Sequence, residues 1–281
     1  FKADRLVLVA ERALEASRLK REIVELRAKA GATATIVGQS SAINQLRQLI
    51  ERVGPANSRI MITGQPGSGK ELAARTIHET SARASGPFVA INAATIGPDT
   101  METELFGVEA GEGRARKVGA LEEAHGGTLY LDEVADMPRE TQGKILRVLV
   151  DQNFQRVGGA TRVHVDVRIV SSTSRALQAM VGQGACREDL FHRLAVVPVR
   201  VPSLSERRED IPMLIEHFMD HLAATSGMPK RRIADDAMAI LQSHDWPGNI
   251  RQLRNNVERM LILAGGDANA ELTADMLPAE I

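Results

Sequence analysis

The sequence has little of several features that would mark simple classes of protein. Its 281 residues contain one cysteine, Cys186, which excludes an internal disulfide and makes a reducing cytoplasm the expected compartment. No apolar run approaches the ~20 residues of a membrane-spanning helix, so we expect no membrane contact. The formal net charge of -1 gives no overall field that would attract nucleic acid.

The bulk composition is that of a globular protein. Apolar residues make up 43% of the sequence and charged residues 25%, and the length suits about two domains. The sequence begins with Phe1 rather than Met, so we interpret it as part of a longer polypeptide. Flanking domains would then carry part of the function.

A glycine-rich segment, Gly64 to Glu71, follows the apolar stretch Ile60 to Ile62. Its glycines allow successive backbone N–H groups to point at phosphate oxygens, and Lys70 adds a positive charge. The residue after the lysine is usually Ser or Thr, whose hydroxyl binds Mg²⁺, but here it is Glu71. The alternative is a plain glycine turn between a strand and a helix.

A second apolar segment, Gly126 to Leu131, ends in two adjacent carboxylates. A parallel strand beside the phosphate loop would bring Asp132 to a magnesium ion and leave Glu133 to polarise an attacking water. Asp132 alone could instead cap the next helix, but Glu133 would then have no explanation. Both segments in this order favour an ATPase.

Three regions divide the chain. The composition of residues 1–32 predicts a linker helix. Its Leu19, Ile23 and Leu26 repeat as in a coiled coil, so the helix either pairs with a copy of itself or packs on its own domain. Residues 33–203 alternate strands and helices, which predicts an α/β fold with a parallel sheet. Residues 204–281 predict a helical lid. The expected strands are Ile60–Ile62, Phe88–Ile91, Thr128–Leu131, Val167–Ser171 and Ala195–Val199, and the expected lid helices are Ile211–Ala223, Asp235–Ser243 and Asn249–Leu263.

Further motifs follow one another along the chain. Besides the phosphate loop they are Asn92, Glu104-Leu105-Phe106-Gly107, Leu131-Asp132-Glu133, Arg187-Glu188-Asp189-Leu190 with Arg193-Leu194, Glu206-Arg207-Arg208-Glu209-Asp210-Ile211, and Trp246-Pro247-Gly248-Asn249-Ile250-Arg251-Gln252-Leu253. Together these motifs resemble the AAA+ domain of the bacterial enhancer-binding proteins that activate sigma-54 RNA polymerase. The resemblance covers residues 36–281 and also accounts for Glu71, because this family commonly has glutamate after the lysine.

The resemblance implies ATP or ADP with Mg²⁺ as ligands. It assigns Lys70 to the phosphates, Asp132 to the metal and Glu133 to the hydrolytic water. Asn92 matches the residue that in this family hydrogen-bonds the catalytic glutamate, although a polar cap of a strand end is the alternative. The implied nucleotide-binding positions are Val37, Gly38, Gly64, Pro66, Gly67, Ser68, Gly69, Lys70, Glu71, Leu72, Thr173 and Arg251.

Arg187 and Arg193 match arginines that a neighbouring subunit inserts at the γ-phosphate, so hydrolysis would require a homo-oligomer, a ring or a dimer. Their alternative is surface pairing with Glu188 or Asp189, worth ~0–1 kcal/mol. Arg251 matches the lid arginine that contacts nucleotide, against the alternative of a solvated helix face. Thr173 precedes Ser174 where the family has Thr-Asn.

One segment departs from the family. Most members carry Gly-Ala-Phe-Thr-Gly-Ala on a loop that engages sigma-54, whereas the loop here, Gly107 to Gly119, is shorter and lacks the Phe-Thr pair. An aromatic residue at a loop tip can grip a partner, and Glu112 and Arg114 offer only solvated charge. This difference argues against sigma-54 remodelling but leaves nucleotide binding and assembly untouched.

The resemblance implies the central domain of a two-component response regulator. Its partners would be copies of itself, DNA through a C-terminal helix-turn-helix outside this sequence, and a sensor kinase through a receiver domain outside it, with an RNA polymerase sigma factor as a candidate. The alternative is a nucleotide-dependent oligomerisation switch that controls DNA binding with little hydrolysis.

Overall fold

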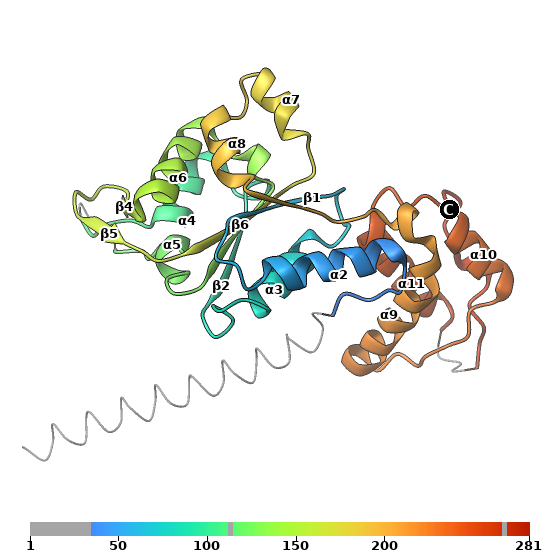
Figure 1. Cartoon of the computed structure of the whole chain (residues 1–281). Helices are drawn as coiled ribbons and strands as arrows, with labels where there is room; N and C mark the ends of the chain where they lie inside the picture. The colour runs from blue at the N-terminus through green and yellow to red at the C-terminus, as the bar shows by residue number, and fades with distance from the viewer. Residues whose placement is uncertain (1–34, 112–114, 266–268) are drawn as a thin grey trace, which may run out of the picture. The chain divides into compact units, whose positions relative to one another are not determined.

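A parallel sheet with helices on both faces forms the first part of the molecule (Figure 1). Residues 35–111, 115–265 and 269–281 are described by this computed structural model, so the predicted linker helix over residues 1–32 lies outside the described part. The five strands lie in the order β2 (Phe88–Asn92), β3 (Thr128–Asp132), β6 (Arg168–Thr173), β1 (Ile60–Thr63) and β7 (Val197–Arg200). All five predicted strands are confirmed, with ends shifted by one or two residues.

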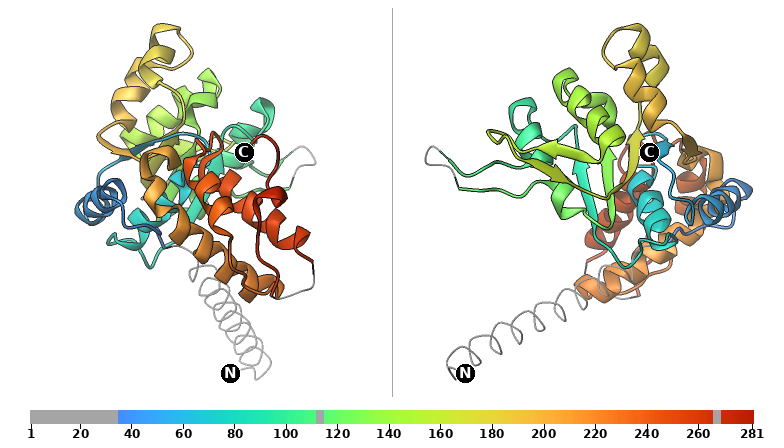
Figure 2. Two further views of the ribbon diagram at one scale, coloured as in Figure 1. Left: turned by 90° about the vertical axis from the view of Figure 1, so that its right-hand side faces the viewer. Right: turned by 60° about the vertical axis from the view of Figure 1, so that its left-hand side comes forward.

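Both faces of the sheet are covered by helices, because successive apolar side chains along a strand point to opposite faces. In β1, Ile60 and Ile62 pack with α2 (Ser41–Val53) and α3 (Lys70–Glu79), whereas Met61 packs on the opposite face. That opposite face is covered by the helices that follow β2, β3 and β6 (Figure 2). These helices are α4 (Pro98–Phe106), α5 (Ala120–Glu123), α6 (Arg139–Asp151), α7 (Leu177–Gly182) and α8 (Glu188–Leu194).

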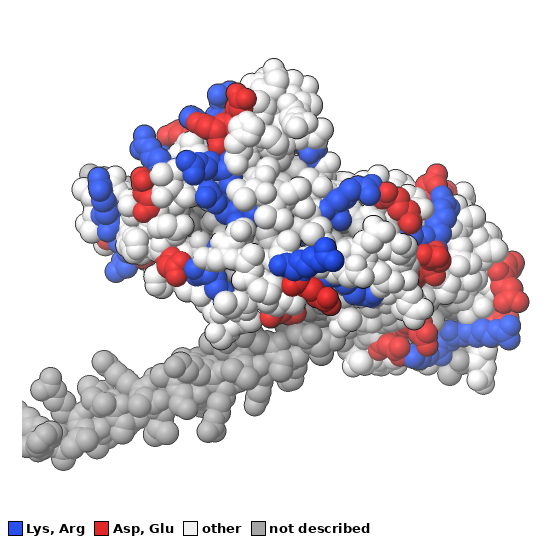
Figure 3. All heavy atoms as spheres, viewed as in Figure 1, with Lys and Arg blue, Asp and Glu red and all other residues white. Residues whose placement is uncertain are grey.

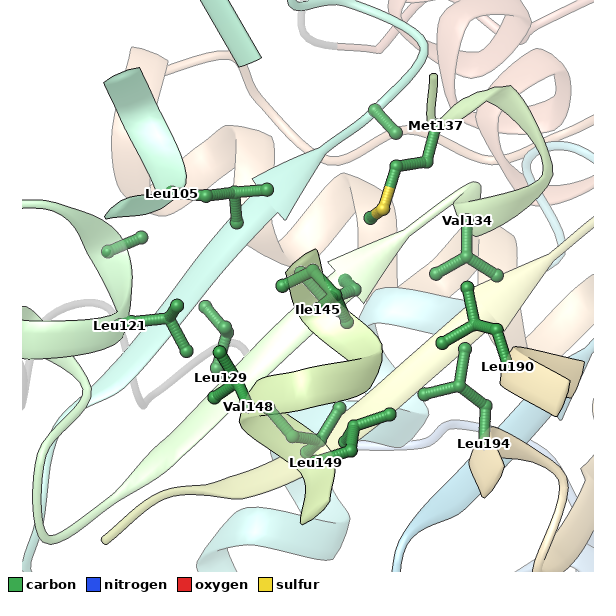
Figure 4. Packing of buried hydrophobic residues seen from close by; sticks show 14 of the residues in the cluster. Leu105, Leu121, Leu129, Val134, Met137, Ile145, Val148, Leu149, Leu190 and Leu194 are labelled. Carbon is green, nitrogen blue, oxygen red and sulfur yellow. The ribbon is translucent and has the colours of Figure 1, made fainter. Parts of the chain in front are cut away.

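The larger core lies between this second group of helices and the sheet (Figure 4). Ile145 and Val148 of α6 point toward Leu129 of β3, and Leu190 and Leu194 of α8 close the same cluster. Each of these side chains is at most 3% exposed. This packing fixes α8 against the sheet. It thereby also fixes the backbone positions of Arg187, just before α8, and Arg193, in its last turn.

A short hairpin follows α6 and was not predicted. Strands β4 (Asn153–Gln155) and β5 (Arg162–His164) pair antiparallel outside the main sheet. Each strand has only three residues, too few for an alternating pattern to be recognised in the sequence.

The helical lid follows β7. It contains α9 (Ile211–Ser226), α10 (Asp235–Ser243) and α11 (Asn249–Leu263), with 3₁₀ turns at Leu204–Asp210 and Ala274–Met276. The predicted α10 and α11 are confirmed in their bounds, and α9 extends three residues beyond the predicted Ala223. The lid has its own core around Trp246, which is 0% exposed and donates from Nε1 to the Leu241 carbonyl. Among the described helices, none has the length and apolarity needed to cross a bilayer.

Arg168 at the start of β6 fastens the turn between α2 and β1 to the sheet. Its guanidinium donates to the carbonyl oxygens of Val53 at 2.9 Å, Gly54 at 2.7 Å and Ser58 at 3.2 Å. The side chain is 3% exposed, and burial, followed by the charge of Arg83, lowers its pKa. The buried guanidinium therefore supplies hydrogen bonds to three carbonyls that water would otherwise have to satisfy.

We expect Arg168→Met to lower the free energy of unfolding by about 2–4 kcal/mol, because it leaves buried carbonyls without donors. Arg83→Met is the control, since Arg83 pairs with the exposed Asp166 and its loss should cost below about 1 kcal/mol. Urea unfolding of both variants measures the difference. Equal losses would contradict this role for Arg168.

Glu206 fixes the start of the lid. Its carboxylate accepts from the backbone N–H of Ser203 at 2.8 Å and from Arg200 at 2.6 Å. The hydrogen bond from Arg200, followed by that from the Ser203 backbone, lowers the pKa of Glu206 to about 2. A depressed carboxyl pKa stabilises the fold above the unfolded-state pKa, and this stabilisation is lost as the pH falls toward 2.

Glu206→Gln should therefore destabilise the chain at pH 7 by about 1 kcal/mol, a value reduced for the solvent exposure of the pair. The difference from wild type should shrink as the pH falls from about 5 toward 2, which urea unfolding at several pH values measures. A difference that stays constant over this range would contradict the assignment.

Candidate functional site

Lys70, Asp132 and Glu133, three of the predicted site residues, lie where the parallel strands end. The phosphate loop follows β1, and Asp132 and Glu133 end β3, but β6 lies between these two strands. The prediction that β3 lies directly beside β1 is thus wrong. With β6 between them, the two strands are roughly 10 Å apart. The side chains of Lys70 and Glu133 span this separation.

The phosphate loop leaves its backbone amides available. Ser68 N–H donates to the Gln65 carbonyl at 3.2 Å, and Gly69 has a left-handed φ of 105° that a side chain would strain. The amides of the loop and the first turn of α3 donate no hydrogen bond within the described residues; these are Gly67, Gly69, Lys70, Glu71 and Leu72. The Ser68 hydroxyl is also buried without a partner. Such a concave group of unused donors fits an anionic polyphosphate.

Lys70 and Glu133 form a buried ion pair. Lys70 Nζ lies 3.0 Å from Glu133 Oε1, with side-chain exposures of 6% and 14%. The ammonium also donates to the carbonyls of Gly64 at 3.2 Å and Gln65 at 3.5 Å. Glu133 takes a left-handed φ of 53°, which turns its side chain toward the loop. The lysine is thereby held at the mouth of the loop, where a phosphate oxygen could take the place of the carboxylate.

Burial alone would raise the pKa of Glu133, but hydrogen bonds from Ser174 and Lys70 outweigh it and lower the pKa. Ser174 donates to Glu133 Oε2 from its backbone N–H at 2.8 Å and from Oγ at 2.9 Å. Both carboxylate oxygens are therefore engaged. Ser174, which departs from the Asn of the family, contacts Glu133, while the preceding Thr173 is buried at the end of β6.

Asp132 is surrounded by neutral donors. Its Oδ1 accepts from Ser172 Oγ, and the Tyr130 hydroxyl lies 2.9 Å from both Oδ1 and Ser172 Oγ. Burial, followed by the charge of Asp132, raises the pKa of Tyr130, which keeps its hydroxyl a donor. The sequence reasoning missed Tyr130 and Ser172. Alternation along β3 puts residues 130 and 132 on one face, but only the insertion of β6 brings Ser172 to them.

The predicted hydrogen bond from Asn92 to the catalytic glutamate is wrong in this structure. Asn92 Nδ2 donates to Asp132 Oδ2 at 2.8 Å. The reason is register, because Asn92 and Asp132 are paired residues of β2 and β3 and face the same side, whereas Glu133 has already turned away. Asn92 therefore lies in the site but orients Asp132.

Val37 and Gly38 lie where the first segment meets the lid. Val37 packs against the lid core, and a Cβ on Gly38 would lie 2.5 Å from Asp210 Oδ2. Asp210 accepts from the N–H groups of Gln39 at 2.6 Å and Ser40 at 2.8 Å, which closes this junction. The segment is thus held by the lid.

Arg251 is exposed near the start of α11, and its Cβ lies 3.2 Å from the position of a Cβ on Gly67. It lines a cavity of about 380 Å³ with Pro66 and Gly248. The structure therefore brings Arg251 to the phosphate loop from the lid side.

Arg187 and Arg193 lie away from the phosphate loop of their own chain. Arg187 forms a bidentate pair with Asp189 at 2.7 and 3.0 Å, as the surface alternative predicts. Arg193 precedes β7 by four residues, and Val197 at the start of β7 pairs with Ile60 at the amino end of β1, so Arg193 lies toward the end of the sheet opposite the loop. Exposed Arg193 has no ion-pair partner among the residues that the structure describes. Neither arginine completes the site in cis.

The loop that follows Gly107 is fastened at its base. Val108 bridges Lys117 on one side and Val157 on the other. Arg156, at the end of the hairpin strand β4, donates to Glu109 at 2.8 Å and to Glu122 at 2.7 Å. These contacts join the loop base to the hairpin and to α5, and residues 112–114 lie outside the described part.

The donor set fits a nucleotide with a magnesium ion. The free amides and Lys70 suit phosphate oxygens, and a single carboxylate such as Asp132 is enough for Mg²⁺, which keeps waters and phosphate oxygens as its other ligands. Within the described residues, no group of three His, Cys, Asp or Glu side chains could hold a metal without such help. A parallel sheet with this edge and a helical lid defines a P-loop nucleotide-binding protein of the AAA+ class.

Family comparison gives the same class and a narrower group. The Sigma-54 interaction domain model matches residues 36–200, and the AAA+ ATPase lid domain model matches residues 205–281. The chain belongs to the sigma-54 interaction domain family, and its C-terminal part is an AAA+ lid.

Several relatives cover the whole chain. The nitrogen assimilation regulatory protein NtrX of Azorhizobium caulinodans is 63% identical over 281 residues, which are 100% of this chain and 62% of the relative. The DNA-binding transcriptional regulator NtrC of Escherichia coli is 40% identical and is covered to 60%. Crystal structures of NtrX from Brucella abortus with ADP and with ATP are 66% identical, with TM-scores of 0.87, and span 100% of this chain. The chain accounts for 63% and 61% of those two proteins, and thus for about three fifths of its relatives.

Proposed function

We propose that this chain is the ATP-binding and ATP-hydrolysing, self-assembling central domain of a bacterial transcription regulator of the two-component response-regulator class. Its functional division would be a linker over 1–32, a nucleotide-binding part over 33–203 and a lid over 204–281. The observation that carries the proposal is the convergence of free loop amides, Lys70, Asp132 and Glu133 at one sheet edge. The NtrX structures with ADP and ATP support nucleotide as the ligand.

Each residue has a chemical task in this proposal. The loop amides and Lys70 would bind the phosphates. Asp132, which is oriented by Asn92, would hold Mg²⁺, and this ion would neutralise phosphate charge. Glu133 orients and deprotonates the attacking water once Lys70 has left it for phosphate. Arg251 would contact the nucleotide from the lid, and Val37 and Gly38 would contact its adenine.

DNA and the sensor kinase would be contacted by parts outside this sequence, in the cytoplasm. Basic and acidic side chains are interspersed on the face seen in Figure 3, over both the sheet domain and the lid. On this face, the mixed charges and the net charge of -1 argue against direct nucleic-acid binding.

Arg193 and Arg187 would act on the nucleotide of a neighbouring copy, because both lie away from the loop of their own chain. Lys70→Ala and Arg193→Ala should each abolish turnover. An equimolar mixture of the two variants should regain about a quarter of the wild-type rate, because one interface in four joins a subunit with intact Lys70 to a neighbour with intact Arg193. Phosphate release at increasing protein concentration measures this. Arg147→Ala, at an exposed arginine of α6, is the control that should turn over normally. A mixture without turnover would refute action in trans.

Glu133→Gln should bind ATP about tenfold more tightly, because Lys70 is no longer neutralised and the carboxylate no longer repels phosphate, while hydrolysis should fall by about 100-fold or more. Calorimetric titration and phosphate release measure the two effects. Glu79→Gln, at the exposed end of α3, changes the net charge equally and should alter neither. An unchanged affinity for ATP would show that the Lys70–Glu133 pair does not compete with phosphate.

A second candidate is a nucleotide-dependent oligomerisation switch with little hydrolysis. The fastened base of the loop at Gly107, which also lacks the Phe-Thr pair, favours this candidate over sigma-54 remodelling. Wild-type protein at high concentration that changes its sedimentation with ATP or ADP, yet releases no phosphate, would support the switch and exclude the ATPase.

A further inference from the structure

The lid makes direct hydrogen bonds to the back of the phosphate loop. Asn249 Nδ2 donates to the Pro66 carbonyl at 3.0 Å, Ile250 N–H donates to the Gly67 carbonyl at 3.0 Å, and Arg207 Nη2 donates to the Ser68 carbonyl at 3.1 Å. Three consecutive loop carbonyls are thus bound by three lid donors. None of these donors belongs to the residues assigned above to the nucleotide.

Peptide geometry gives these contacts a consequence on the other side of the loop. In a trans peptide the carbonyl of one residue and the N–H of the next point in opposite directions. When the carbonyls of Pro66 and Ser68 face the lid, the amides of Gly67 and Gly69 face away from it. These two amides are among those that donate no hydrogen bond within the described residues.

The lid donors are themselves fixed. Asn249 is 0% exposed, has a left-handed φ of 52°, and accepts from the Leu204 N–H at 2.8 Å through Oδ1. Arg207 is 3% exposed and sits at a kink in the 3₁₀ segment, with a φ of -142°. The approach is close, since a Cβ on Gly67 would lie 2.3 Å from the Gly248 carbonyl oxygen. Buried donors in set conformations are suited to hold a loop in one shape.

We propose that Asn249 and Arg207 are positioning residues for the phosphate loop: they hold its carbonyls toward the lid, so that the amides of Gly67 and Gly69 point to the polyphosphate. Affinity for nucleotide then depends on lid residues that do not touch it. This inference rests on the proposed nucleotide-binding function. Because coupling is reciprocal, bound nucleotide in turn strengthens the docking of the lid.

The test is calorimetric titration of the whole 281-residue chain with ADP. Asn249→Ala and Arg207→Met should each weaken ADP binding by about tenfold, the effect of one lost hydrogen bond of about 1.4 kcal/mol. Arg208→Met is the matched control: among the described residues, Arg208 donates only to lid groups, which are the carbonyls of residues 242–244 and the Asp245 carboxylate. It should therefore leave ADP affinity unchanged. Arg207→Lys, which retains a donor, should recover part of the loss.

Trp246, the single tryptophan, is buried in the lid core and reports lid folding in the same samples. Native Trp246 emission together with weakened ADP binding supports positioning. Native emission with ADP affinity within about twofold of wild type in both variants would overturn it. If wild type itself binds no ADP, the proposed function fails instead.

A measurement on the wild-type chain does not depend on variants that fold. Hydrogen exchange at the Ile250 amide, which donates to Gly67, should slow when ADP is added. Exchange that is unchanged by saturating ADP would overturn the coupling between lid and loop.

Discussion

The buried ion pair of Lys70 and Glu133 is the contact on which the candidate site depends. It joins the start of α3, which follows β1, to the end of β3. Strands β1 and β3 are not neighbours in the sheet, because β6 lies between them. A buried pair is stable only when its remaining donors and acceptors are satisfied, and here Ser174 and two loop carbonyls do so. The pair also keeps the lysine charge neutralised until a stronger anion competes for it.

Much of the fold could be predicted because its signals are local. Each main strand is a short apolar run, and the lid helices repeat apolar residues at helical spacing between glycines and prolines. Leu253, Val257, Met260 and Leu261 repeat at helical spacing along α11, and all four are buried. Periodicity could not reveal the β4–β5 hairpin, whose strands are shorter than the pattern needs.

The candidate site could be predicted in part of its members but not in their contacts. Lys70, Asp132 and Glu133 follow from the chemistry at two strand ends, whereas the partner of Asn92 depends on the register between β2 and β3. The same holds for Tyr130 and Ser172, which meet at Asp132 only because β6 enters the sheet between β3 and β1. Strand order and register are tertiary properties, and residue type at one position does not encode them.

The double pairing of Val108 has a mechanical consequence. The segment at Val108 is bonded to Lys117 on one side and to the Val157 segment on the other, so it cannot move alone without breaking backbone hydrogen bonds on both sides. Arg156 adds a charged crosslink from the same hairpin to Glu109 and Glu122. Any displacement of this region would therefore move the loop base, the β4–β5 hairpin and α5 together.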